Sequence, residues 1–121
     1  MERILKTGEG WRLGWNPQAE DYAGLVGGED WAVELTVVEL QEFCRLLQQL
    51  GDAIASITPE LMAEEHLTCA VEGESLWLEA DGLPHHYSLR LILNQGRRAE
   101  GNWPPTAIPG LLQAAQMLNV F

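Results

Sequence analysis

The sequence predicts an α+β protein in which an antiparallel sheet carries helices on one face or end. Three observations predict this class. Short runs of alternating polar and apolar residues occur in two groups, turn residues separate neighbouring runs, and an amphipathic helix follows each group. We therefore expect the 121 residues to form one domain of two strands-then-helix units, 1–57 and 67–121, with about four strands and one helix in each.

The first unit begins with short strands bounded by Gly, Pro, Asn or Asp. Trp11, Leu13 and Trp15 alternate with Arg12 and Gly14, which is typical of a half-buried strand. Proline cannot donate to a strand ladder, so the Asn-Pro pair that follows ends this run. The expected strands cover residues 3–6 (a weak edge strand), 11–15, 22–26 and 31–35.

A helix is predicted to begin after Thr36, because Thr36 and Glu39 have the spacing of a capping box. Its apolar residues recur three and four positions apart, which predicts one buried stripe about five turns long. That stripe packs on its own sheet or forms a seam with a second copy of the chain. The stripe consists of Leu40, Phe43, Leu47, Leu50, Ile54 and Ile57, with Glu39, Glu42, Arg45, Gln49 and Asp52 on other faces. A second helical turn is expected from Thr58 to about His66.

The second unit is a meander of four strands followed by a helix. Turn residues separate the expected strands and produce antiparallel neighbours. The strands cover 67–72, 75–80, 86–93 and 98–103, with turn residues at 81–84, and the last helix carries Ile108, Leu111, Leu112, Ala115 and Leu118. Four tryptophans at strand positions beside Gly or Pro are expected to fill space that glycine leaves free, or, as the alternative, to form a row of stacking residues: Trp11, Trp15, Trp31 and Trp103.

The meander has an apolar face and a polar face. Alternation places these residues toward the core: Leu67, Cys69, Val71, Leu76, Leu78, Ala80, Tyr87, Leu89, Leu91 and Leu93. The other face carries Thr68, Glu72, Trp77, Glu79, His86, Ser88, Arg90 and Ile92. Trp77 and Arg90 are unusual there, because an exposed aromatic beside a cation suits base stacking or peptide binding. The alternative is that a helix, a loop or another subunit covers Trp77.

Arg97 and Arg98 lie at a predicted turn near Arg90, and these are three of only seven basic residues. Guanidinium groups in a cluster could bind a phosphate or a carboxylate. The alternative is a set of surface salt bridges with acids such as Glu79 and Glu100. The candidate binding surface is therefore Trp77, Arg90, Arg97 and Arg98.

The sequence predicts no catalytic, metal or cofactor site. His85 and His86 are adjacent in or beside a strand, so their side chains point to opposite faces, and His66 lies in an acidic turn. None of the common zinc, nucleotide or hydrolase motifs occurs. Cys44 and Cys69 have apolar neighbours, which favours buried reduced thiols.

Charge restricts the partners. With 18 acidic and 7 basic residues, the net charge is −11, so phosphate-rich partners and anionic membranes are disfavoured. No apolar run approaches the roughly 20 residues of a membrane span, and no signal peptide is recognised. We expect a cytoplasmic protein without a membrane partner.

Four strings resemble a family of small cyanobacterial proteins, domain of unknown function 1818: 10–15, 25–35, 87–90 and 96–104. The resemblance spans nearly the whole chain. It implies a fold like that of the Whirly single-stranded-DNA-binding regulators, in which each of two units has four strands and a helix. It transfers no functional residue, and fold does not fix function.

We therefore expect a non-enzymatic binding or regulatory module that contacts a protein or a small ligand through the face of Trp77 and Arg90 or through the helix stripe. The first alternative is single-stranded nucleic-acid binding, and the second is a small enzyme with a site at strand ends. A homodimer through the helix stripe is also open.

Overall fold

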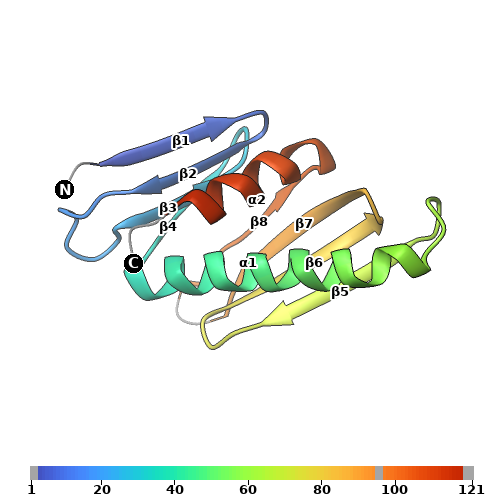
Figure 1. Ribbon diagram of the computed structural model, residues 1–121. Coiled ribbons are helices and arrows are strands. Elements are labelled where there is room, and N and C mark those ends of the chain that lie inside the picture. The colour runs from blue at the N-terminus through green and yellow to red at the C-terminus, as the bar shows by residue number, and fades with distance from the viewer. Residues whose placement is uncertain (1–2, 95–96, 119–121) are drawn as a thin grey trace.

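The computed structural model describes residues 3–94 and 97–118, which form two four-stranded antiparallel sheets and two helices (Figure 1). The first sheet contains, in order, β1 (Ile4–Gly8), β2 (Trp11–Trp15), β3 (Gly24–Gly27) and β4 (Ala32–Leu35). Helix α1 (Val37–Ile57) and the 3₁₀ turn η1 (Thr58–Glu60) follow. The second sheet contains β5 (Leu67–Glu72), β6 (Leu76–Leu83), β7 (His86–Leu93) and β8 (Glu100–Trp103), before η2 (Pro105–Ala107) and α2 (Ile108–Met117). The predicted α+β class and the repeated order of four strands and a helix are confirmed.

Several boundaries differ from the sequence prediction. The edge strand β1 is a full five-residue strand, and β3 begins at Gly24 rather than at residue 22. Strand β6 continues past residue 80 because Gly82 and Leu83 still pair with β7, which shrinks the predicted turn to Pro84 and His85. Strand β8 begins at residue 100 rather than 98, because Arg98 has a positive φ of 52° that an extended strand does not allow.

The capping box at the start of α1 is confirmed. The hydroxyl of Thr36 accepts from the N–H of Glu39 (3.1 Å), and the Glu39 carboxylate accepts from the N–H of Thr36 (2.9 Å). At the other end Thr58 belongs to the cap of α1, since its hydroxyl donates to the Ile54 carbonyl (2.6 Å). The expected turn to about His66 therefore stops at Glu60.

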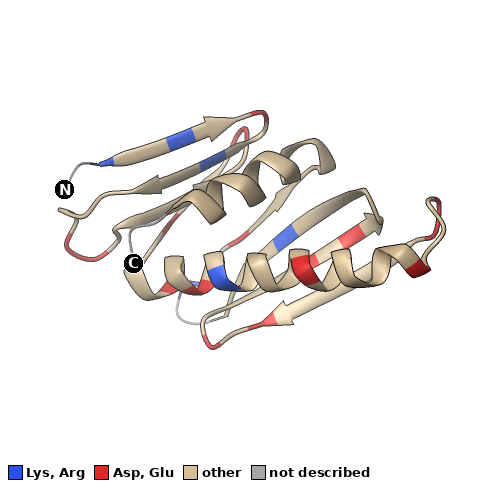
Figure 2. Cartoon of the chain, in the orientation of Figure 1, with Lys and Arg blue, Asp and Glu red and all other residues tan. Residues whose placement is uncertain are grey.

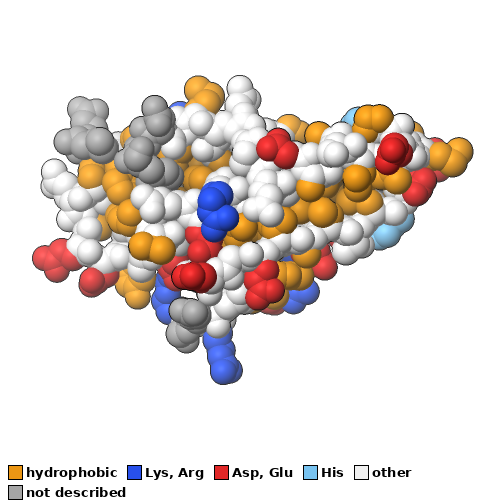
Figure 3. Space-filling model, turned by 60° about the horizontal axis from the view of Figure 1, so that its bottom comes forward, with side chains coloured by type: hydrophobic (Ala, Val, Ile, Leu, Met, Phe, Trp, Pro, Cys, Tyr) orange, Lys and Arg blue, Asp and Glu red, His pale blue; other side chains and the backbone are white. Residues whose placement is uncertain are grey.

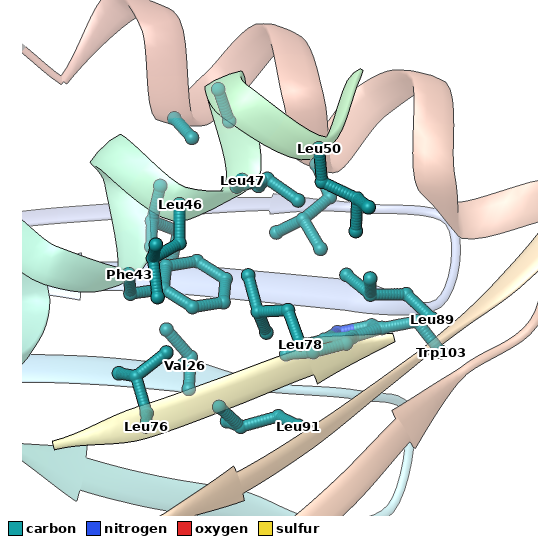
Figure 4. Packing of buried hydrophobic residues seen from close by; sticks show 14 of the residues in the cluster. Val26, Phe43, Leu46, Leu47, Leu50, Leu76, Leu78, Leu89, Leu91 and Trp103 are labelled. Carbon is teal, nitrogen blue, oxygen red and sulfur yellow. The ribbon is translucent and has the colours of Figure 1, made fainter. Parts of the chain in front are cut away.

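The core lies between the helices and the inner faces of both sheets (Figure 4). Five of the six predicted stripe residues are buried, whereas Ile57 is exposed near the end of α1. Phe43 and Trp103 meet at the centre of the core, with ring centroids 5.8 Å apart. Helix α1 packs on β5 and β6, and α2 packs on β1, β2 and α1.

The prediction that tryptophans fill space left by glycine is confirmed for Trp11 and Trp31. A Cβ at Gly8 or at Gly110 would collide with the Trp11 indole, and a Cβ at Gly28 or Gly101 would collide with that of Trp31. Two indole N–H groups also join the sheets, because Trp31 donates to the Asn102 carbonyl (3.0 Å) and Trp103 to the Gly27 carbonyl (2.8 Å).

Candidate binding face of the second sheet

The face of the second sheet that points away from α1 is accessible to solvent. We call it the outer face. Alternation places twelve residues on it, and none of them is buried. They are Thr68, Ala70, Glu72, Trp77, Glu79, Asp81, His86, Ser88, Arg90, Ile92, Glu100 and Asn102.

Trp77 lies near one end of this face and is half-buried by its neighbours in the same sheet. It pairs with Glu72 on β5 and with Ile92 on β7, and the guanidinium carbon of Arg90 lies 5.9 Å from its ring centroid. Arg90 also forms an ion pair with Glu100 (3.0 Å). The salt-bridge interpretation of Arg90 is thus confirmed, and the Trp77 ring already accommodates one cation.

Arg97 does not contact Trp77 or Arg90. Its guanidinium donates to the carbonyl of Glu34 on β4 and to the carboxylate of Glu39 on α1, and it stacks over the Tyr22 ring at 4.6 Å. Arg98, next to it, is exposed. Arg97 therefore fastens the segment between β7 and β8 to the first sheet, while Arg90 remains on the outer face.

The outer face is acidic. It carries the carboxylates of Glu72, Glu79, Asp81 and Glu100 against the single arginine Arg90, which Glu100 already pairs. The basic residues are dispersed over both sheets and α1 (Figure 2). A face with this excess of carboxylates attracts cations and repels phosphate.

A polar cluster that the sequence analysis did not identify surrounds Asp81. Its carboxylate accepts from the Thr68 hydroxyl (2.8 Å) and lies 3.0 Å from Nε2 of His66. These two neighbours, Thr68 first, lower the pKa of Asp81 below its usual 3.8. The Ser88 hydroxyl donates to the Asp81 carbonyl (3.2 Å), so the cluster joins β5, β6 and β7. Asp81 lies four residues further along β6 than Trp77. The pairing register of the strands could have revealed this cluster, because it makes Thr68, Asp81 and Ser88 direct cross-strand neighbours.

Glu42 positions the β5–β6 hairpin that carries Trp77. The sequence pattern placed Glu42 on a polar face of the helix, but it is buried, with 8% of its surface exposed. Its Oε1 accepts from the backbone N–H groups of Ser75 (2.9 Å) and Leu76 (3.0 Å). A Cβ at Gly73 would collide with the same carboxylate, so the hairpin turn closes around Glu42. Glu42 lies outside the predicted apolar stripe and is nevertheless buried, because a backbone turn supplies polar partners for its carboxylate inside the fold.

A groove of about 420 Å³ lies between α1, α2 and the β6–β7 turn. Its lining includes Gly51, Asp52, His85, Tyr87 and Leu112. Burial raises the pKa of Tyr87, so this phenol stays neutral at physiological pH. Within the described residues, no group of three or more His, Cys, Asp or Glu side chains is placed to hold a metal ion.

This is an α+β domain with two four-stranded sheets, and its most distinctive surface is an acidic, tryptophan-bearing sheet face. The chain belongs to the family described as Domain of unknown function (DUF1818), which matches residues 6–118. It is similar to a crystal structure from Prochlorococcus sp. NATL2A, described as a protein with unknown function from the DUF155 family. The identity is 29%, the TM-score is 0.88, and the match covers 93% of this chain and 96% of that one. No curated protein matches the chain. In the described part of the chain, no helix is both long and apolar enough to cross a membrane.

Proposed function

We propose that the protein is a non-enzymatic binding module, and that the outer face of its second sheet binds a positively charged segment of a partner protein. One observation carries the proposal: Trp77 presents an aromatic ring on an uncovered face where four carboxylates outnumber one arginine. Lysine and arginine side chains are attracted both by aromatic rings and by carboxylates. Arg90, stacked at 5.9 Å, is an intramolecular example of the contact that a partner would make.

The alternative is single-stranded nucleic-acid binding by a Whirly-like regulator. The order of four strands and a helix, repeated once, and the stacking of Arg90 on Trp77 favour it. Such binding requires a basic groove beside the aromatic residues. Arg90 and Arg97 are instead paired with Glu100 and Glu39, which leaves few cations for phosphate. For this reason we place a basic protein segment first. We also propose a cytoplasmic location and a cyanobacterial origin for the protein.

The test is a titration with labelled probes at low ionic strength, read by fluorescence anisotropy. The probes are a peptide in which lysine alternates with valine, its glutamate–valine counterpart and oligothymidine. We expect saturable binding of the lysine peptide alone, weakened by added salt. Tight, salt-sensitive binding of oligothymidine instead would overturn the proposal in favour of the alternative.

Matched variants locate the binding surface. Glu79→Gln removes a charge from the outer face, whereas Glu29→Gln removes an exposed charge from the β3–β4 turn of the first sheet. Both variants change the net charge equally, so only a local site distinguishes them. We expect Glu79→Gln and Trp77→Ala to weaken binding and Glu29→Gln to leave it within about two-fold. Equal losses for the two charge variants would show non-specific attraction and refute the proposed site.

A further inference from the structure

Strand β5 has an unpaired edge. The N–H of Gly73 donates to the Leu76 carbonyl (2.9 Å) and closes the β5–β6 hairpin. Bonded and non-bonded pairs alternate along an antiparallel ladder, and the register continues through Val71 opposite Leu78. The odd-numbered residues of β5 therefore bond to β6. The even-numbered residues turn their backbone N–H and C=O groups to the open side: Thr68, Ala70 and Glu72.

The other sheet edges are closed or protected. Side chains of Trp31, Trp103 and Arg97 cross between the sheets beside β4 and β8. Strand β1 is open, but Lys6 lies opposite the buried Leu13 on the core-facing side of the sheet. An inward-pointing lysine is a common device against further strand pairing. No lysine, proline or bulge interrupts β5, so it is the edge best suited to accept another strand.

We infer that an extended segment of the partner pairs with β5 and continues the second sheet, with lysine or arginine at alternate positions. The inference rests on the proposed function and specifies how the partner binds. Backbone hydrogen bonds to Thr68, Ala70 and Glu72 supply the affinity, and alternate side chains supply the specificity.

The two faces of the sheet dictate the pattern of the segment. On the outer face Ala70 is small and lies opposite Glu79, so a long cationic side chain beside Ala70 reaches that carboxylate. Glu72 lies opposite Trp77 in the next row. On the inner face, partly buried apolar side chains of α1 and β5 pack against the core, among them Cys44, Cys69 and Val71. Figure 3 shows a band of hydrophobic side chains on one face of the molecule. The segment therefore alternates basic and apolar residues.

Charge distinguishes this partner from a second copy of the chain. The edge is flanked by Glu64 and Glu65 before β5 and by Glu74 after it, and Glu72 lies within it. A second copy pairing through β5 would bring two acidic edges together, on top of a net charge of −11 for each chain. A basic segment finds complementary charge along the same edge.

The experiment uses Ala70→Pro. Proline removes the outward N–H of Ala70 and no bond to β6, so an edge position tolerates it. Thr7→Pro is the matched control, since the same alternation, from the β1–β2 register, places the Thr7 backbone on the open side of β1. We expect Ala70→Pro to weaken binding of the lysine–valine peptide by about ten-fold or more, and Thr7→Pro to leave its affinity within about two-fold of the wild-type value. Circular dichroism of each variant reports folding.

A second measurement does not depend on the variant. The lysine–valine peptide with N-methyl groups on every backbone nitrogen retains its charge but has no N–H group left on either edge to pair with a strand, and we expect it to lose binding to the wild-type protein. If this peptide binds as tightly as its parent while Trp77→Ala still weakens both, strand addition is wrong and the proposed function stands. If no lysine peptide binds at all, the proposed function fails with it. If sedimentation shows a wild-type dimer that Ala70→Pro dissociates, a second copy occupies the edge and the inference is overturned.

Discussion

Replacing Glu42 should reveal how strongly α1 holds the hairpin that carries Trp77. One oxygen of Glu42 accepts both backbone N–H groups, those of Ser75 and Leu76. Glu42→Ala removes the acceptor and leaves two donors, one of them buried, without a partner. Charge-assisted bonds contribute about 1.5–3 kcal/mol each, offset by the cost of burying the carboxylate. We expect a loss of about 2–3 kcal/mol in the free energy of unfolding.

Glu42→Gln separates the acceptor from the charge. The glutamine carbonyl oxygen can occupy the position of Oε1 and still accept both N–H groups, so the loss should be about 1 kcal/mol. Gln41→Ala, at the exposed neighbour on α1, is the control and should change stability by less than about 0.5 kcal/mol. Urea unfolding followed by circular dichroism measures all three variants, with the slope of the transition unchanged.

Equal losses for Glu42→Ala and Glu42→Gln would refute this reasoning, because the negative charge rather than the shared acceptor would then stabilise the turn. So would a loss in Glu42→Ala no larger than that of Gln41→Ala. A readout at the binding face extends the test. Glu42→Ala should also weaken binding of the lysine–valine peptide more than Glu42→Gln does, since α1 then no longer holds the hairpin that carries Trp77.

Three further changes have definite outcomes. Thr68→Val removes the first cause of the lowered Asp81 pKa, so that pKa should rise toward 3.8 in an NMR pH titration. Because the pKa of Asp81 is lower in the folded than in the unfolded protein, Asp81 stabilises the fold at pH values above its unfolded pKa, and this contribution is lost as pH falls through its folded pKa. The free energy of unfolding of the variant should therefore depend less on pH in the acid range. Burial raises the pKa of Cys44 to about 11, so at pH 8 only about one thiol in a thousand is ionised. Iodoacetamide should leave Cys44 unmodified until urea unfolds the protein. Gly101→Ala should displace the Trp31 indole, lower stability by about 1–3 kcal/mol and change the tryptophan fluorescence.

Local sequence signals predicted the elements whose causes are local. The cap of α1 depends on Thr36 and Glu39, three positions apart, and both of its hydrogen bonds form. The two faces of the second sheet followed from alternation alone, because every strand of the meander has one side against the core. The same alternation placed Trp77 and Arg90 together on the outer face, and they are in contact.

Contacts between distant segments could not be predicted in this way. Arg97 follows the second sheet in sequence but binds Glu34 and Glu39, about sixty residues earlier. The partners of Glu42 are also distant in sequence, since they lie in a turn more than thirty residues away. A helical pattern assigns a carboxylate to solvent unless a backbone turn is known to surround it. Gly82 continued β6 past the expected turn for a related reason, because its cross-strand partners Leu67 and Tyr87 decide where the strand ends.

The position of Arg97 also changes how the charge of the protein should be understood. Three arginines close in sequence suggested a local exception to an acidic surface, and that exception was the main support for a phosphate ligand. The fold separates them, because Arg97 neutralises Glu39 beside the first sheet and Arg90 neutralises Glu100 within the outer face. What remains unpaired by arginine near Trp77 is Glu72 and Glu79. The net charge of −11 excludes no partner by itself, whereas this local distribution favours a cation at the sheet face that carries Trp77.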